Sequence, residues 1–334
     1  MKSMLLNRQA PVERAPLEWI DVPDPVPGPL EARVKVSCCA VCRTDLHVVE
    51  GDLHPPALPI IPGHQIVGVV DALGPTCRRL RLGMRVGVAW LRHTCGACRF
   101  CTSERENLCE SSRYTGFHAH GGFAEYAVVP EDFAYELPES FDDMTAAPLL
   151  CAGIIGYRAL LRCNLRRNEP LGLFGFGSSA HVVLQLATHR GHEVYVVTRG
   201  RMHQDMARAL GAAWCGAEAS GLPRRLDAAI VFAPSGAVVP AALAALERGG
   251  RVALAGIHMT PIPQLDYDAY LYGERDVHPV TANTRADGRA LLAEAAEVAV
   301  RPRTTVYPLR DANRALADVK AGTVDGTAVL VVNS

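Results

Sequence analysis

Two short stretches of the chain bring together a thiol, a hydroxyl, a carboxylate and two imidazoles. Residues 42–47 read Cys-Arg-Thr-Asp-Leu-His, and residues 62–65 read Pro-Gly-His-Gln. A catalytic zinc needs three protein ligands with sulfur, nitrogen or oxygen donors and one open position. Cys42 and His64 can supply two ligands, and the distant Cys151 is the candidate for the third. Without further support, such a pair is more often a buried thiol and a hydrogen-bonded imidazole. The proline and glycine residues predict a site built on loops.

A second set of thiols follows at Cys95, Cys98, Cys101 and Cys109. Four cysteines at this spacing can close a tetrahedral shell around a structural zinc. A Cys-x-x-Cys redox pair and an iron–sulfur cluster are the alternatives. The redox pair leaves two of the four thiols unexplained, and no second cysteine set accompanies the run as in two-cluster proteins. We therefore expect a zinc that pins a loop with little core of its own.

The elements that must hold these residues change in character along the chain. The first 150 residues predict an all-β domain, with strands at 33–37, 66–70, 84–89 and 124–129. From about residue 152 the pattern becomes alternating strand and helix. Segment 228–246 is uncharged and long enough to span a membrane, but internal proline and glycine residues break it into strand, turn and helix. The last strand, at 327–332, suggests that the chain returns to the first domain.

A glycine-rich turn opens the alternating region. A buried strand at 171–174 precedes Gly175-Phe-Gly-Ser-Ser-Ala180, and a helical run and a second strand follow. In such a unit Gly175 makes the turn, Gly177 lets the backbone approach a pyrophosphate, and Ala180 allows close helix packing. We expect dinucleotide binding here, with an ordinary strand-to-helix turn as the alternative.

The residues after the second strand favour NADP over NAD. An NAD site places Asp or Glu there to bind the ribose hydroxyls. This chain has Thr198 and Arg199, followed by Gly200 and Arg201. These side chains can bind a 2′-phosphate, and no carboxylate repels it. NAD(H) is possible if both arginines face solvent.

Two zinc sets, a Gly-His pair before a strand, the downstream glycine turn and Gly-Gly-Phe-Ala-Glu-Tyr at 121–126 together resemble the zinc-dependent medium-chain alcohol dehydrogenases. The resemblance covers essentially the whole chain. It implies an α/β protein with a β-rich part: a GroES-like catalytic domain at 1–151 and 286–334, and a Rossmann domain at 152–285. It also implies catalytic zinc on Cys42, His64 and Cys151, structural zinc on the four-cysteine set, and a homodimer or homotetramer.

The resemblance implies an activity as well: interconversion of alcohols and aldehydes or ketones by hydride transfer with NADP(H). Thr44 would hydrogen-bond the substrate oxygen, and His47 would end a proton relay to solvent. Asp45 would orient His64, and Arg43 would contact a cofactor phosphate. A zinc-independent enone or quinone reductase and a non-catalytic dinucleotide-binding protein are the alternatives.

Two positions depart from the family pattern, and two others match its substrate pocket. Gln65 replaces a usual Glu, and Thr327 replaces an Arg that many relatives carry as a phosphate contact. Leu53 and Trp90 match positions that line the alcohol site in relatives, and Tyr114 and Phe117 are further candidates. This apolar lining suits primary alcohols and aldehydes.

The composition of the chain bears on its binding partners and on the compartment in which it works. The 334 residues carry 34 Lys and Arg against 35 Asp and Glu, a formal net charge of −1. Nothing in this balance favours nucleic acid or a membrane surface. Eleven cysteines, an odd number, without a signal peptide argue against a disulfide framework and for a cytoplasmic protein.

Overall fold

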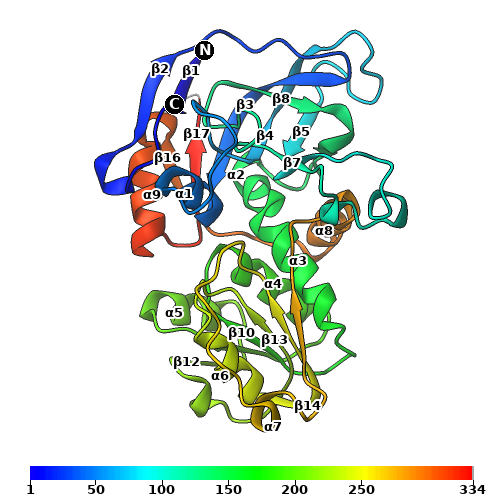
Figure 1. Ribbon diagram of the computed structural model, residues 1–334, viewed down its shortest axis with the longest axis vertical. Coiled ribbons are helices and arrows are strands. Elements are labelled where there is room, and N and C mark those ends of the chain that lie inside the picture. The colour runs from blue at the N-terminus through cyan, green and yellow to red at the C-terminus, as the bar shows by residue number, and fades with distance from the viewer. Residues whose placement is uncertain (333–334) are drawn as a thin grey trace. The chain divides into compact units, whose positions relative to one another are not determined.

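The computed structural model describes residues 1–332 and divides them into two compact units (Figure 1). The first unit comprises residues 1–151, 282–296 and 302–332, and the second comprises 152–281 and 297–301. The expected second boundary, at 286, falls just inside helix α8 (Arg285–Val298), and the units divide at 282 instead.

The first unit is built on a seven-stranded sheet, counted within residues 1–332. Its order is β16-β17-β3-β4-β5-β9, and β8 pairs with β3 as well. The strands are β3 (Glu31–Val41), β4 (Gln65–Leu73), β5 (Arg85–Val88), β8 (Tyr126–Pro130), β9 (Ala134–Glu136), β16 (Thr304–Pro308) and β17 (Thr327–Val331). The four strands predicted in the first 150 residues are therefore present. Two small pairs complete the unit: β1 (Lys2–Leu6) with β2 (Leu17–Asp21), and β6 (Leu91–His93) with β7 (Arg113–Tyr114).

The last strand of the chain lies inside this sheet. β17 is parallel to β16 on one side and antiparallel to β3 on the other, where Ala328 faces Val41. In Figure 1 the red C-terminal strand accordingly lies beside the blue N-terminal part of the chain. Strand periodicity alone predicted a C-terminal strand, and the pairing shows where it goes.

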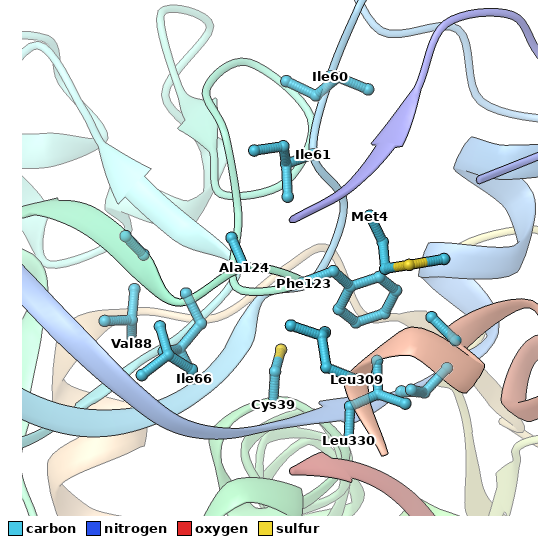
Figure 2. Packing of buried hydrophobic residues seen from close by; sticks show 14 of the residues in the cluster. Met4, Cys39, Ile60, Ile61, Ile66, Val88, Phe123, Ala124, Leu309 and Leu330 are labelled. Carbon is cyan, nitrogen blue, oxygen red and sulfur yellow. The ribbon is translucent and has the colours of Figure 1, made fainter. Parts of the chain in front are cut away.

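The core of the first unit is formed by side chains from distant parts of the sequence. Figure 2 shows Phe123 among Met4, Ile66, Cys39 and Leu330, and all five are at most 1% exposed. Cys39, which the sequence left without a role, is thus a small apolar core residue. Ile61 and Ile66 belong to this core, so it holds the backbone of residues 61–65 in place.

The second unit is a six-stranded sheet, counted within the described residues, in which all neighbouring strands are parallel. Its order is β12 (Trp214–Gly216), β11 (Val194–Val197), β10 (Leu171–Phe174), β13 (Leu226–Val231), β14 (Leu246–Leu254) and β15 (Asp276–Pro279). The helices are α3 (Ala152–Cys163), α4 (Ser178–His189), α5 (Arg201–Ala209), α6 (Val238–Ala244) and α7 (Tyr267–Tyr270). The order 3-2-1-4-5-6 is that of the dinucleotide-binding Rossmann fold, whose strand order reverses between β10 and β13.

The uncharged segment 228–246 is divided between strand β13 and helix α6, as predicted. Among residues 1–332, no single helix is long and apolar enough to cross a membrane. One broken pair, Asp143–Leu150 and Ala152–Cys163, passes the same test of length and composition when its two parts are taken together.

The first unit also contains helices, and one corrects an expectation. The site at 42–65 was expected to be built on loops, but residues 43–50 within it form helix α1 (Arg43–Glu50). The other helices of this unit are α2 (Asp143–Ala146), α8 and α9 (Ala312–Ala321). Helix α1 forms because Cys42 and Asp45 cap its first turn reciprocally, each side chain accepting a backbone N–H. Leu46, Val48 and Val49 of the helix pack into the core. The loop prediction was wrong because cysteine is an uncommon N-cap residue.

Candidate active site

Cys42 occupies the N-cap position of helix α1. Its Sγ accepts the Thr44 N–H at 3.4 Å, and Asp45 Oδ2 accepts the Cys42 N–H at 2.9 Å. This is a reciprocal capping box in which a thiol replaces the usual hydroxyl. The position favours a thiolate, because the helix N-terminus carries partial positive charge.

His64 follows a turn that requires glycine. Gly63 has φ +95°, and a Cβ there would collide with the Phe123 ring. The fully buried His64 donates from Nδ1 to Asp45 Oδ1 at 2.9 Å, and Gly63 N–H donates to the same oxygen at 3.2 Å. His64 Nε2 lies 3.4 Å from Cys42 Sγ. Asp45 therefore caps the helix with one oxygen and orients the imidazole with the other.

Cys151 completes a trio. It directly follows a short helical turn, Ala147–Leu150, and its Sγ, Cys42 Sγ and a His64 ring nitrogen lie within 4.8 Å of one another. Two sulfurs and one nitrogen at this separation fit a zinc ion with one position left open.

The three groups of the trio shift one another's pKa. A hydrogen bond from Cys151, together with His64, lowers the pKa of Cys42 well below its usual value despite burial. The pKa of Cys151 rises, because its thiol donates that bond and is buried. Burial alone would lower the pKa of His64, but Asp45 and Cys42 raise it to about 10. A metal ion binding here would replace protons that the ligands otherwise hold.

The four-cysteine set forms a second cluster in the first unit. One Sγ each from Cys95, Cys98, Cys101 and Cys109 lie within 4.8 Å of one another. Backbone N–H groups point at these sulfurs: Cys98 N–H donates to Cys95 Sγ at 3.3 Å, and Cys95 N–H to Cys109 Sγ at 3.4 Å. Backbone hydrogen bonds also lower the pKa of Cys95 to about 6. The eleven cysteines all lie within the described residues, and none forms a disulfide.

The glycine turn of the second unit has the geometry of a phosphate site. Gly175 follows β10 with φ +89°, and a Cβ there would lie 3.0 Å from the Ala233 nitrogen. Gly177 is the N-cap of α4, and a Cβ there would meet no atom within 4 Å, so the space above the helix N-terminus is open. Ala180 is fully buried. An open helix N-terminus at the strand-order reversal suits a pyrophosphate.

The residues that predict cofactor choice lie at the end of the neighbouring strand. Thr198 directly follows β11, and its N–H donates to Gly216 O at 2.8 Å. Arg199 is exposed, and the exposed Arg201 is the first residue of α5. Both guanidinium groups therefore belong to a single strand-to-helix turn.

Comparison with known proteins agrees with this geometry. Residues 28–139 match the alcohol dehydrogenase GroES-like domain. The chain is 49% identical to a probable alcohol dehydrogenase, AdhA, of Mycobacterium tuberculosis, over 99% of this chain and 97% of that protein. This chain belongs to the medium-chain alcohol dehydrogenase family.

Solved structures of the family are similar over nearly the whole chain. A cinnamyl alcohol dehydrogenase from Sorghum bicolor (SbCAD4) has a TM-score of 0.90 at 28% identity, covering 99% of this chain and 97% of that one. A cobalt- and zinc-bound thermostable alcohol dehydrogenase from Pyrobaculum aerophilum has a TM-score of 0.90 at 26% identity, covering 99% of both chains. This medium-chain dehydrogenase is thus an oxidoreductase for small-molecule alcohols with a nicotinamide cofactor, and its GroES-like and Rossmann folds are as predicted.

The other predicted residues of this alcohol dehydrogenase lie in the first turn of helix α1 or among the aromatic rings next to His64. Thr44 is buried in the first turn of α1, and Arg43 beside it is exposed. Trp90 contacts the His64 ring edge-on at 4.9 Å between centroids and stacks on Tyr114 at 4.9 Å. The ring centroids of Phe117 and Trp90 are 5.8 Å apart.

Leu53 and the two departures from the family pattern all have defined places. Leu53 packs partly buried against the core of the first unit. Gln65 begins β4 and is fully buried next to His64. Thr327 begins β17, is 1% exposed, and donates its N–H to Arg303 O at 2.9 Å.

One partner of the predicted site residues was missed by the sequence reasoning. His47 Nδ1 lies 2.7 Å from Asp52 Oδ2. The sequence does place Asp52 directly after Gly51, a residue suited to ending a helix. Without a helix predicted before Gly51, nothing indicated that Asp52 would lie next to His47.

Proposed function

We propose that this chain is a zinc-dependent alcohol dehydrogenase that interconverts apolar primary alcohols and aldehydes and prefers NADP(H). The observation that carries the proposal is the trio of Cys42, His64 and Cys151, whose donor atoms lie within 4.8 Å of one another. Cys₂His is the donor set of catalytic zinc in alcohol dehydrogenases. Zinc supplies Lewis acidity there, which polarises a carbonyl or makes an alcohol more acidic.

The chain's own residues orient the metal ligand His64 and carry the proton between the substrate and solvent. Asp45 holds His64 by its Nδ1, so that Nε2 is the ligand atom. Thr44 is buried in the turn that follows Cys42, where its hydroxyl can hydrogen-bond the substrate oxygen. His47, one helical turn further on, passes the proton towards solvent, and the exposed Arg43 binds a cofactor phosphate.

The four-cysteine cluster holds the second zinc, which has a structural role. Four thiols leave no open coordination position, and the exposed loop around them contributes little to the core. A neighbouring carboxylate, that of Glu106, ties this loop to helix α8 by accepting the Arg285 N–H at 3.0 Å.

NADP(H) preference is supported by the turn between β11 and α5. Arg199 and Arg201 are both exposed there, and neither Asp nor Glu occupies the position that binds ribose hydroxyls in NAD sites. Gly175, Gly177 and Ala180 bind the pyrophosphate at α4, and Thr198 and Arg199 bind the 2′-phosphate.

The substrate pocket is apolar. Trp90 lies against His64 and is backed by Tyr114 and Phe117, and Leu53 belongs to the same unit. Such surfaces favour aliphatic or aromatic groups over polyols. We also propose a homodimer or homotetramer, and a cytoplasmic location in keeping with eleven cysteines free of disulfides.

The test is the initial rate of NADPH and NADH oxidation with a panel of aliphatic and aromatic aldehydes, with and without a zinc chelator. We expect faster turnover with NADPH and loss of activity with the chelator. Arg199→Ala should raise the KM for NADPH about tenfold, the loss of one charge-assisted contact, and change that for NADH little. Arg208→Ala, an exposed arginine further along α5, is the matched control.

Each outcome of this test bears on a different part of the proposal. Chelator-sensitive turnover with NADH alone would contradict the NADP preference and keep the zinc assignment. Equal effects of Arg199→Ala on both cofactors would contradict the 2′-phosphate role. Chelator-resistant reduction of enones would favour the zinc-independent reductase, and dinucleotide binding without turnover would favour a binding protein.

A further inference from the structure

A fully buried histidine with no assigned function lies next to the glycine turn of the second unit. His181 is in the first turn of helix α4 and is 0% exposed. Its Nδ1 lies 3.0 Å from Gly177 O, and its backbone N–H donates to the same oxygen at 3.1 Å. The Gly177 carbonyl therefore receives two hydrogen bonds from one residue.

The side-chain bond fixes the state of the imidazole. A carbonyl oxygen can only accept, so His181 Nδ1 must carry the hydrogen. The backbone bond is the ordinary first hydrogen bond of an α-helix, which almost any residue at position 181 would make. The side-chain bond needs a donor at the δ position of the side chain. It is therefore specific to the residue at this position and is not supplied by the helix itself.

The glycine turn needs such an anchor because two of its three residues are glycines. Gly175 and Gly177 lack a Cβ, so many backbone conformations are open to them. Phe176 between them is 3% exposed, which holds the middle of the turn in the interior. Gly177 has no side chain of its own with which to cap α4. The imidazole of His181 instead fixes the end of the turn from the helix side.

Fixing the Gly177 carbonyl also fixes the direction of the next N–H group. This carbonyl and the Ser178 N–H belong to one planar trans peptide, in which they point in opposite directions. Because the carbonyl points along α4 towards His181, the Ser178 N–H points out of the helix N-terminus. The space there is open, since a Cβ on Gly177 would meet no atom within 4 Å. N–H groups in this position bind phosphate.

Helix α4, which carries the imidazole, is packed tightly into the second unit. A Cβ on Gly156 of α3 would lie 2.6 Å from Val183 Cγ2, so the two helices approach each other closely. Val182, Val183 and Leu184 are all fully buried. His181 therefore attaches a glycine-rich turn to a rigid element, as a precise binding site requires.

We propose that His181 is a positioning residue for cofactor binding: its buried Nδ1–H fixes the Gly177 carbonyl, so that the Ser178 N–H is aimed at the pyrophosphate of the dinucleotide. This inference rests on the proposed function of the glycine turn as the pyrophosphate site. His181 acts through the Gly177 peptide. A turn that is already fixed loses less conformational freedom when the cofactor binds, and the cofactor is therefore bound more tightly.

The affinity for ADP-ribose, which carries the pyrophosphate without the nicotinamide, tests this role by calorimetric titration of the full-length protein. We expect His181→Leu to raise the Kd about five- to tenfold, since one hydrogen bond to the turn is lost. His181→Asn, whose amide nitrogen can take the place of Nδ1, should restore most of the affinity. His181→Gln, whose amide nitrogen takes the place of Nε2, should not. His189→Gln, at the exposed end of α4, is the matched control and should bind as the wild type does.

Kinetics and NMR distinguish positioning from a general loss of structure. NADPH and NADH carry the same pyrophosphate, so His181→Leu should raise both KM values by about the same factor. The value of kcat at saturating cofactor should change by less than about twofold. In ¹⁵N-histidine-labelled protein, two-bond ¹H–¹⁵N correlation spectra should show a protonated His181 Nδ1, with His181→Asn to assign the signal.

Gly177→Asp separates failure of this inference from failure of the proposed function. Asp is a favoured N-cap residue, so α4 should still form, but the carboxylate would repel the pyrophosphate and ADP-ribose binding should be lost. Wild-type affinity in Gly177→Asp would overturn the proposed pyrophosphate site, and this inference with it. Loss of binding in Gly177→Asp with unchanged affinity in His181→Leu would overturn the inference alone. Equal affinities of His181→Asn and His181→Gln, or a wild-type His181 without a proton on Nδ1, would do the same.

Discussion

Asp45 shows how much one side chain can do at this site. Its two oxygens cap helix α1 at the Cys42 N–H and hold the Nδ1 of His64. Burial raises the pKa of this carboxyl, although the neighbouring His64 opposes the rise. A carboxylate this deeply buried is tolerated because its oxygens accept several N–H groups. The cap of helix α1 and the orientation of His64 therefore depend on the same residue.

Replacing the sulfur of Cys151 by oxygen tests whether Cys42, His64 and Cys151 bind a zinc ion. Cys151→Ser should reduce alcohol oxidation to below about one per cent of wild type, because the hydroxyl is a poor zinc ligand at neutral pH. Bound zinc, measured by atomic emission, should fall from two ions per chain to one, while the circular dichroism spectrum is retained.

The half-buried Cys215 of the second unit provides the control for this variant. Cys215→Ser should keep both zinc ions and full activity. Retained activity in Cys151→Ser would refute the assignment of the catalytic zinc.

At the scale of elements, the cap of helix α1 and one contact of the four-cysteine loop determine where the predicted site residues lie. Helix α1 brings Thr44, Asp45 and His47 onto a rigid element, although the glycine and proline residues around it predicted a loop. The four-cysteine loop is similarly held: Glu106, 7% exposed, accepts hydrogen bonds from the backbone and side chain of Arg285 at the start of α8. The cap was missed because cysteine is an uncommon N-cap residue, and the loop anchor was missed because Glu106 and Arg285 are far apart in the sequence.

The Glu106–Arg285 contact predicts a pH dependence of stability. Burial alone would raise the pKa of Glu106, but hydrogen bonds and charge from Arg285 lower it below its usual value. A lowered folded-state pKa contributes stability above the unfolded pKa, and this is lost as the pH falls through the folded pKa. Glu106→Gln should therefore cost about 1 kcal/mol at neutral pH and progressively less in acid, measured by urea unfolding.

Glu110→Gln, an exposed residue of the same loop, should show no such cost at any pH. A deficit in Glu106→Gln that is constant from neutral to acidic pH would show that the Glu106 charge does not stabilise the fold.

At the scale of the whole molecule, the chain ends in the unit in which it began. Strand β17 lies between β16 and β3, and it therefore joins β16 to the five strands of the same sheet that come from residues 31–136. The unit that carries both cysteine clusters cannot complete its core until the last strand has been added.

A pair of neighbouring valines tests this dependence. Val329 on β17 and Val306 on β16 are partners in register, but Val329 is fully buried and Val306 is 54% exposed. Val329→Asp buries an unpaired carboxylate at a cost of at least about 3 kcal/mol, a large part of the stability of an ordinary domain. We expect loss of the first unit's cooperative unfolding transition and of bound zinc.

The matched variant Val306→Asp should fold and bind zinc as the wild type does. Similar behaviour of the two variants would argue against a central role for β17.

The sequence alone was sufficient wherever the signal is local. Cysteine spacing identified the four-thiol cluster, and the strand–glycine–helix pattern identified β10 and α4, because such patterns follow from backbone geometry over a few residues. Cys42, His64 and Cys151 were candidate ligands from their donor types and from the family resemblance, and the distances between their donor atoms came from the fold. Only the tertiary structure decided that residues 43–50 form a helix, that Asp52 bonds His47, and that β17 lies beside β3. The cap of α1 and the Asp52–His47 contact join residues only three and five positions apart, and they were missed because cysteine is an uncommon N-cap residue. The place of β17 depends on backbone N–H and C=O groups that find partners far along the chain, and no local pattern encodes that choice.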